Sequence, residues 1–297
     1  MDYKSILLTA SQELVGITGQ TVEIVDVKKP SSIDYAVQLS KIISKLSPLV
    51  GNLIEFSTVD YLNKFDWQGL GKWKRQDPGF PDATFESDII NPNPGIEIKA
   101  WFPFATEITA RFRDSVKIFK PNHINMALIA WLPEYVIFGK PQIIDVLIVS
   151  GKSVAQARDK HYHKPPHYLV IEPEDTSSRT GNLQQTNTMG YRFQEDKSDI
   201  KAAQKIVDQW DKEFLEYSPK KKYQDLIRQS LQSRFKYRLD TNYAKIDRIE
   251  HGDIELFKEK VMNQEFKGRT IKAWVNLLNT KDLSLLEVEL KRLLALT

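Results

Sequence analysis

The chain has 297 residues, of which 41% are hydrophobic and 27% are charged, and its formal net charge at pH 7 is +3. This composition is typical of a globular protein and excludes disordered and collagen-like chains. The sequence contains no cysteine, which excludes disulfides, cysteine-ligated zinc, iron–sulfur clusters and thiol nucleophiles. The apolar run near the N-terminus is too short for a signal peptide and no run is long enough to span a membrane, so we expect a cytoplasmic protein.

The first part of the chain, to about residue 65, is predicted to be helical. Apolar residues recur at three- and four-residue steps between Leu39 and Val50, which places them on one helix face. Ser47-Pro48 interrupts this run and indicates an N-cap followed by proline at the first position of a second helix. Two packed helices are therefore expected here.

Short apolar runs separated by Pro, Gly and Asp fill the central part of the chain, from about residue 80 to residue 175. Such β-branched runs are typical of the strands of a central sheet. We predict strands at 95–101, 126–132, 143–149 and 168–171, with a helix at 153–162 between the last two. The pattern indicates an α/β core.

A long polar segment, residues 173–192, follows this core, and helical patterns return after residue 198. Ser284 and Glu287 have the spacing of a capping box for the last helix. We expect an α/β core that includes the N-terminal helices and the polar loop (1–196), and a basic helical region packed on that core (197–297).

The charge is unevenly distributed between these two parts. Residues 197–297 carry 21 Lys and Arg against 16 Asp and Glu, whereas residues 1–196 carry 21 against 23. A basic region suits a polyanionic partner. The alternative is that helical surfaces are simply rich in lysine.

One stretch carries recognisable chemistry: Pro81-Asp82, then 14 residues, then Glu97-Ile98-Lys99. On a strand, successive side chains alternate between faces, so Glu97 and Lys99 project to one side while Ile98 enters the core. Two carboxylates offer hard oxygen ligands to Mg²⁺, which takes its other ligands from water and phosphate. Lys99 can orient water or stabilise charge on a phosphate.

An acid-x-Lys triplet alone has little value, because several occur by chance in a chain of this composition. Glu97-Ile98-Lys99 differs from the others in combining a predicted buried strand with an upstream Pro-Asp. Together, Pro81-Asp82 and Glu97-Ile98-Lys99 resemble the active-site signature of the PD-(D/E)XK nuclease superfamily, and in particular of type II restriction endonucleases. The alternative is that Asp82 lies in an ordinary turn and that Glu97 and Lys99 form a surface pair.

The resemblance implies an α/β core with a mixed central sheet flanked by helices, and cleavage of double-stranded DNA at a short palindrome. It implies Mg²⁺ as cofactor, with Mn²⁺ as a substitute, and a homodimer that works beside a cognate DNA methyltransferase. By position, Asp82 and Glu97 would bind the metal and Lys99 would be the catalytic lysine.

Family members often add an acid from a preceding helix, and Glu55 is the candidate because Gly51, Asn52 and Thr58 leave room beside it. The alternative for Glu55 is a solvated surface residue.

The polar segment is the candidate for base recognition, because Arg can contact guanine and Asn or Gln adenine through paired hydrogen bonds. The alternative is a solvated loop that binds nothing. Lys152 and Arg158 are expected to contact phosphates. The base-reading candidates are Arg179, Asn182, Gln184, Gln185, Asn187 and Thr188.

The function predicted from the sequence is thus a Mg²⁺-dependent, site-specific DNA endonuclease of the type II restriction class. Three alternatives stay open: a nuclease of the same superfamily that acts in repair or junction cleavage, a DNA-binding protein without catalysis, and an adaptor that touches no nucleic acid.

Overall fold

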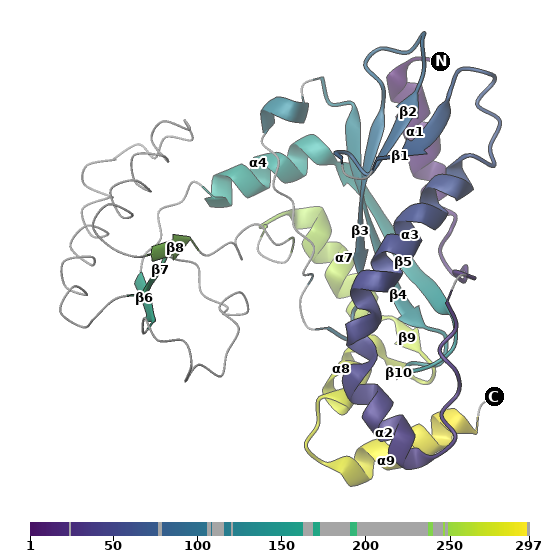
Figure 1. Ribbon diagram of the computed structural model, residues 1–297, viewed down its shortest axis with the longest axis vertical. Helices are drawn as coiled ribbons and strands as arrows, with labels where there is room; N and C mark the ends of the chain where they lie inside the picture. Colours follow the sequence, from purple (N-terminus) through teal and green to yellow (C-terminus); the bar gives the residue numbers. More distant parts are fainter. Residues whose placement is uncertain are drawn as a thin grey trace. The chain divides into compact units, whose positions relative to one another are not determined.

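The computed structural model describes residues 1–23, 25–76, 79–105, 108, 116–119, 121–162, 169–172, 191–194, 237–239, 246 and 249–295. The chain divides into two compact units (Figure 1). The first comprises Met1–Ala110, Val116–Val154 and His251–Thr297, and the second comprises Arg111–Ser115 and Ala155–Glu250. The predicted boundary at residue 196 lies outside the described residues and stays a prediction.

The first unit is built on a five-stranded sheet of order β1-β2-β3-β4-β5. The strands are β1 (Lys72–Arg75), β2 (Ala83–Glu86), β3 (Gly95–Trp101), β4 (Ile124–Pro133) and β5 (Pro141–Ser150). The β3–β4 pair is parallel and the other three pairs are antiparallel. The predicted α/β fold with a mixed central sheet flanked by helices is confirmed at this level.

Three helices precede the sheet: α1 (Tyr3–Val15), α2 (Ile33–Ile42) and α3 (Ser47–Leu62), with the 3-10 turn η1 (Ile43–Leu46) before α3. The chain between α1 and α2 is not helical, because Thr21 and Val27 form bridges with the β4–β5 region. Ser47 is the first residue of α3 and makes no capping hydrogen bond, so its predicted role as an N-cap is wrong. Pro48 nevertheless lies in the first turn, where its missing N–H costs nothing.

One face of the sheet is covered by α1 and α3 (Figure 1). Gly51 of α3 lies against Ala100 of β3, where an added Cβ would be 3.7 Å from the Ala100 Cβ. Asn125 of β4 donates to the Ser11 hydroxyl of α1 (3.1 Å). Since Asn125 pairs with Ile96, two residues before Ile98 on β3, the side chains of Ile96, Ile98 and Ala100 all face these helices.

The other face receives α7 (Gly252–Asn263). Phe257 of α7 packs on Trp101 with ring centroids 6.1 Å apart, and Lys260 pairs with the buried Asp145 of β5 at 2.6 Å. α7 is followed by β9 (Glu265–Phe266), β10 (Arg269–Thr270), α8 (Ile271–Leu278) and α9 (Leu283–Leu294). These C-terminal helices belong to the same unit as the sheet and α9 contacts α2.

The last helix is capped differently from the prediction. The carboxylate of Asp282 accepts hydrogen bonds from the N–H groups of Ser284 (3.1 Å) and Leu285 (3.3 Å). Asp282 is therefore the N-cap, and the predicted capping box of Ser284 and Glu287 is wrong.

The remaining described elements are η2 (Val116–Phe119), α4 (Gly151–Tyr162), β6 (Leu169–Glu172), β7 (Tyr191–Gln194) and β8 (Tyr237–Leu239). The predicted helix at 153–162 is confirmed within α4. The strand predicted at 168–171 exists as β6, but it pairs with β7 in a separate three-stranded sheet rather than joining the central one. Among the described residues, every helix is too short or too polar to cross a membrane.

Candidate active site

Strand β3 sets the positions of Glu97 and Lys99. Because Ile96, Ile98 and Ala100 face α1 and α3, the alternation of a strand directs Glu97, Lys99 and Trp101 to the opposite face. The contact between Trp101 and α7 on that face agrees with this assignment. The predicted alternation of the acid-x-Lys triplet is therefore confirmed.

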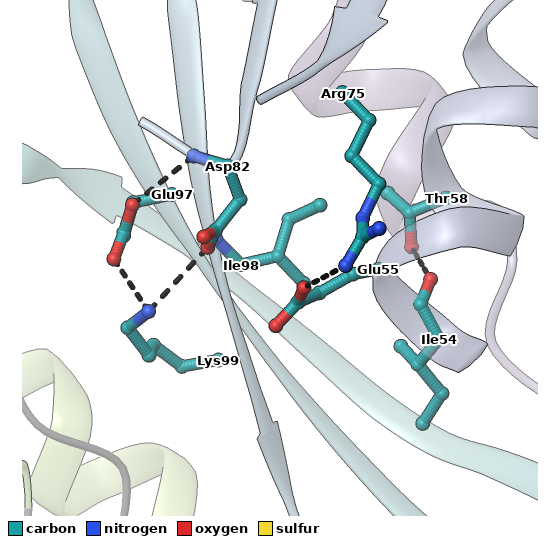
Figure 2. Close-up of polar contacts among 8 residues, drawn as sticks. All are labelled: Ile54, Glu55, Thr58, Arg75, Asp82, Glu97, Ile98 and Lys99. Atoms are coloured by element: carbon teal, nitrogen blue, oxygen red, sulfur yellow. Dashed lines mark hydrogen bonds and ion pairs between the residues drawn. The ribbon is translucent and has the colours of Figure 1, made fainter. Parts of the chain in front are cut away.

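Asp82 lies one residue before β2, where the pairing of β2 with β3 ends at Ala83 and Ile96. The N–H of Ile98 donates to Oδ2 of Asp82 (2.7 Å), and the N–H of Asp82 donates to Oε2 of Glu97 (3.2 Å) (Figure 2). The Asp82 carboxylate thus accepts a hydrogen bond from the backbone of β3, next to Glu97, and the Glu97 carboxylate accepts one from the backbone of Asp82. This exchange fixes both acids against the same stretch of β3.

Gly95 allows this segment to approach β3. A Cβ at position 95 would lie 2.4 Å from Cγ of Pro81, which no side chain tolerates, so only glycine lets Pro81 pack at the start of the strand. The position of Asp82 therefore depends on the absence of a side chain at Gly95.

The ammonium group of Lys99 lies between the two carboxylates (Figure 2). Its Nζ is 3.4 Å from Oδ2 of Asp82 and forms an ion pair with Oε1 of Glu97. The three side chains are largely shielded from solvent, with exposed fractions of 17% for Asp82, 10% for Glu97 and 14% for Lys99. The structure brings together all three residues predicted to carry the chemistry.

Glu55 comes from α3, which packs on the other face of the sheet, and it lies within electrostatic range of the cluster. Its Oε2 is 3.4 Å from Nη2 of Arg75 on β1 (Figure 2), and its carboxylate interacts electrostatically with Asp82 and Lys99. Glu55 is therefore not the solvated surface residue of the alternative interpretation. Arg75 is a site residue that sequence reasoning missed, because β1 was not predicted.

Burial and the neighbouring charges shift the proton affinities of this cluster. Burial raises the pKa of Glu97 to about 7, and the repulsion from Asp82 adds to the effect while Lys99 opposes it. Burial and the Asp82 charge also raise the pKa of Glu55. For Lys99, burial alone would lower the pKa, but the charges of Asp82 and Glu97 outweigh it and the pKa is raised. Lys99 is thus cationic at neutral pH. Its charge does not fully compensate the nearby carboxylates, because the pKa values of Glu97 and Glu55 are still raised.

The donor set can be compared with what a divalent cation requires. Within the described ranges, no group of three or more His, Cys, Asp and Glu side chains is already arranged to hold a metal ion. Asp82 and Glu97 provide two adjacent carboxylates, which is the number Mg²⁺ commonly takes from a protein when it also binds phosphate. In this structure both oxygens of Glu97 and Oδ2 of Asp82 accept bonds from N–H or ammonium donors.

The predicted DNA contacts are only partly within the described residues. Lys152 and Arg158 lie on α4, and Arg158 is 7% exposed. Its role in binding phosphate stays a prediction that requires the guanidinium to be accessible to DNA. All six base-reading candidates, from Arg179 to Thr188, lie outside the described residues, and Tyr191 and Arg192 at the end of the predicted loop belong to β7.

No protein-family model, curated protein or solved structure matches this chain.

Proposed function

We propose that this chain is a Mg²⁺-dependent DNA endonuclease with the PD-(D/E)XK core, of the type II restriction class. It would hydrolyse both strands of double-stranded DNA at a short palindromic site. The observation that carries the proposal is the meeting of Asp82, Glu97 and Lys99 at one point, where β3 extends past its pairing with β2. Two shielded carboxylates next to a cationic lysine are the groups that metal-assisted phosphodiester hydrolysis requires.

The residues present fit Mg²⁺. The raised pKa of Glu97 means that Lys99 alone does not offset the cost of holding Asp82 and Glu97 ionised together. A divalent cation would supply the missing positive charge, with Asp82 and Glu97 as its ligands and Glu55 as a third carboxylate nearby. When bound, Mg²⁺ would polarise the phosphate and the attacking water, and Mn²⁺ would substitute for it.

The chain's own groups then have separate tasks. Asp82 and Glu97 hold negative charge at fixed positions because backbone N–H groups orient them. Lys99 stays protonated, so it would stabilise the negative charge that develops on the phosphate oxygens rather than act as a base. The ion pairs with both acids hold its Nζ at the site before substrate binds.

Three further features belong to the same proposal. Recognition of the DNA bases is assigned to the polar segment, residues 173–192, and contacts with the DNA phosphates are assigned to Lys152 and Arg158. A palindromic site read by two identical subunits requires a homodimer. A cytoplasmic nuclease of this class also needs a cognate DNA methyltransferase that protects the host's own sites.

The test is digestion of supercoiled plasmid by the purified protein in Mg²⁺. We expect discrete linear fragments from the natural chain and no cleavage by Lys99→Ala, which should still bind DNA because binding uses other contacts. Lys140→Ala is the matched control, since Lys140 also forms an ion pair with a glutamate, Glu23, but lies in the connection between β4 and β5. Near-normal cleavage by Lys99→Ala would overturn the catalytic assignment.

Other outcomes identify the alternatives. A smear, or cleavage that depends on DNA structure, indicates a superfamily nuclease with a repair or junction-cleaving task. Salt-dependent DNA binding without cleavage in Mg²⁺ or Mn²⁺ indicates a DNA-binding protein whose acids are structural.

A further inference from the structure

The face of the sheet that carries Glu97 and Lys99 continues across β2 to the edge strand β1. Thr84 of β2 pairs with Gly95 on one side and with Lys74 on the other, and Glu86 pairs with Lys72. Paired residues in a sheet project to the same face. Since Gly95 is two residues before Glu97, Lys72 and Lys74 lie on the same face as Glu97.

Trp73 and Arg75, the alternate residues of β1, face the other side of the sheet and have partners there. Trp73 is buried against Phe85, with ring centroids 5.5 Å apart, and Arg75 forms the ion pair with Glu55 of α3. These contacts fix the orientation of β1, so Lys72 and Lys74 cannot turn into the core.

Both lysines are exposed and available to an anion. Lys74 pairs with Glu86 at 3.0 Å, but the two side chains are 61% and 43% exposed, and such surface pairs are weak and exchange readily. Lys72 is exposed and forms no ion pair with any residue that the structure describes. This pair of residues is called the β1 strip below.

The distances suit a nucleic acid backbone. Neighbouring strands are about 4.8 Å apart, so β1 lies about 10 Å from β3. A DNA strand places successive phosphates about 3.4 Å apart along the helix axis. Lys74 is level with Gly95, four residues and so about 13 Å along the strands from Lys99, and Lys72 lies two residues further away. A DNA backbone that passes Lys99 would therefore reach β1 several phosphates away.

We propose that the β1 strip binds the phosphate backbone of double-stranded DNA several phosphates away from the cleaved bond. The inference rests on the proposed nuclease function and adds to it a binding surface on the catalytic face. Phosphate contacts of this kind set the register of the protein on DNA without reading its sequence.

The test measures how DNA binding depends on salt. Binding of a labelled duplex of about 30 base pairs and mixed sequence is followed by fluorescence anisotropy in EDTA between about 50 and 200 mM salt. Each lost phosphate contact lowers the slope of log K against log salt by about 0.9, so the Lys72→Ala/Lys74→Ala double variant should lose almost 2. Its affinity near 0.1 M salt should fall by about tenfold or more.

Two further variants sharpen the result. Glu86→Gln removes the acid that competes for Lys74, so it should bind the duplex more tightly and with a steeper slope. Lys45→Ala is the control, because Lys45 is also exposed but lies in η1, next to the helix that covers the opposite face. In plasmid cleavage, the double variant should raise KM and leave kcat nearly unchanged.

The outcomes separate the inference from the proposed function. A wild-type slope in the double variant, from a protein that binds and cuts DNA normally, overturns the inference alone. Binding of Glu86→Gln no tighter than that of the natural chain also counts against it. A natural chain that shows no salt-dependent binding to DNA overturns both.

Discussion

The charge on Glu97 should destabilise the folded protein in the absence of a metal ion. Its pKa rises from 4.5 to about 7 on folding. Between these two pH values the folded state keeps a proton that the unfolded chain releases, so the free energy of unfolding falls as the pH rises through this window. At about 1.4 kcal/mol for each tenfold change in proton affinity, this amounts to about 2–3 kcal/mol between pH 5 and pH 8.

Replacing Glu97 with Gln removes this titration. From pH 5 to pH 8, the free energy of unfolding of Glu97→Gln should therefore decrease by about 2–3 kcal/mol less than that of the natural chain. Urea unfolding in EDTA at the two pH values measures both differences. The same variant should be inactive, because it lacks a metal ligand. If both proteins lose the same stability between pH 5 and pH 8, the reasoning about Glu97 is refuted.

Three other results are expected. Gly95→Ala should cut plasmid at least tenfold more slowly and unfold with about 1–3 kcal/mol less stability, because its Cβ would displace Pro81; wild-type cleavage would contradict this. Glu289→Gln should lower the free energy of unfolding by about 1–3 kcal/mol at pH 7, because hydrogen bonds from Arg269 and Arg292 hold the pKa of Glu289 at about 2. This contribution should disappear as the pH falls from about 4.5 through 2. Equal melting curves of the variant and the natural chain at pH 7 would refute it. Millimolar Mg²⁺ should stabilise the natural chain, by about 1.4 kcal/mol in free energy of unfolding at ten times its Kd, and so raise its melting temperature, but not that of Asp82→Asn; an equal rise in both would exclude Asp82 as a ligand.

The central strands could be predicted because their signals are local. β3, β4 and β5 are apolar runs long enough to stand out, and the alternation within β3 was sufficient to place Glu97 and Lys99 on one face. β1 and β2 have four residues each, and the Lys-Trp-Lys-Arg sequence of β1 alternates charge with a single aromatic residue. Their pairing depends on partners elsewhere in the chain, which propensity does not encode.

The contacts that complete the site are also long-range. Nothing near Arg75 in the sequence indicates that it meets Glu55, 20 residues away on a helix. The requirement for glycine at position 95 comes from Pro81, which packs on it from a different segment. In the same way, the bridges formed by Thr21 and Val27 with Gln142 and Gly139 interrupt the region, to about residue 65, that was expected to be helical.

The reciprocal hydrogen bonds between Asp82 and β3 make the two acids a single mechanical unit. Glu97 cannot swing toward a ligand without releasing the N–H of Asp82, and Asp82 cannot do so without releasing the N–H of Ile98. Transplanting this chemistry into another scaffold would therefore mean moving the Pro81–Asp82 turn and the first half of β3 together. Grafting the three side chains alone would leave behind the backbone that aims them.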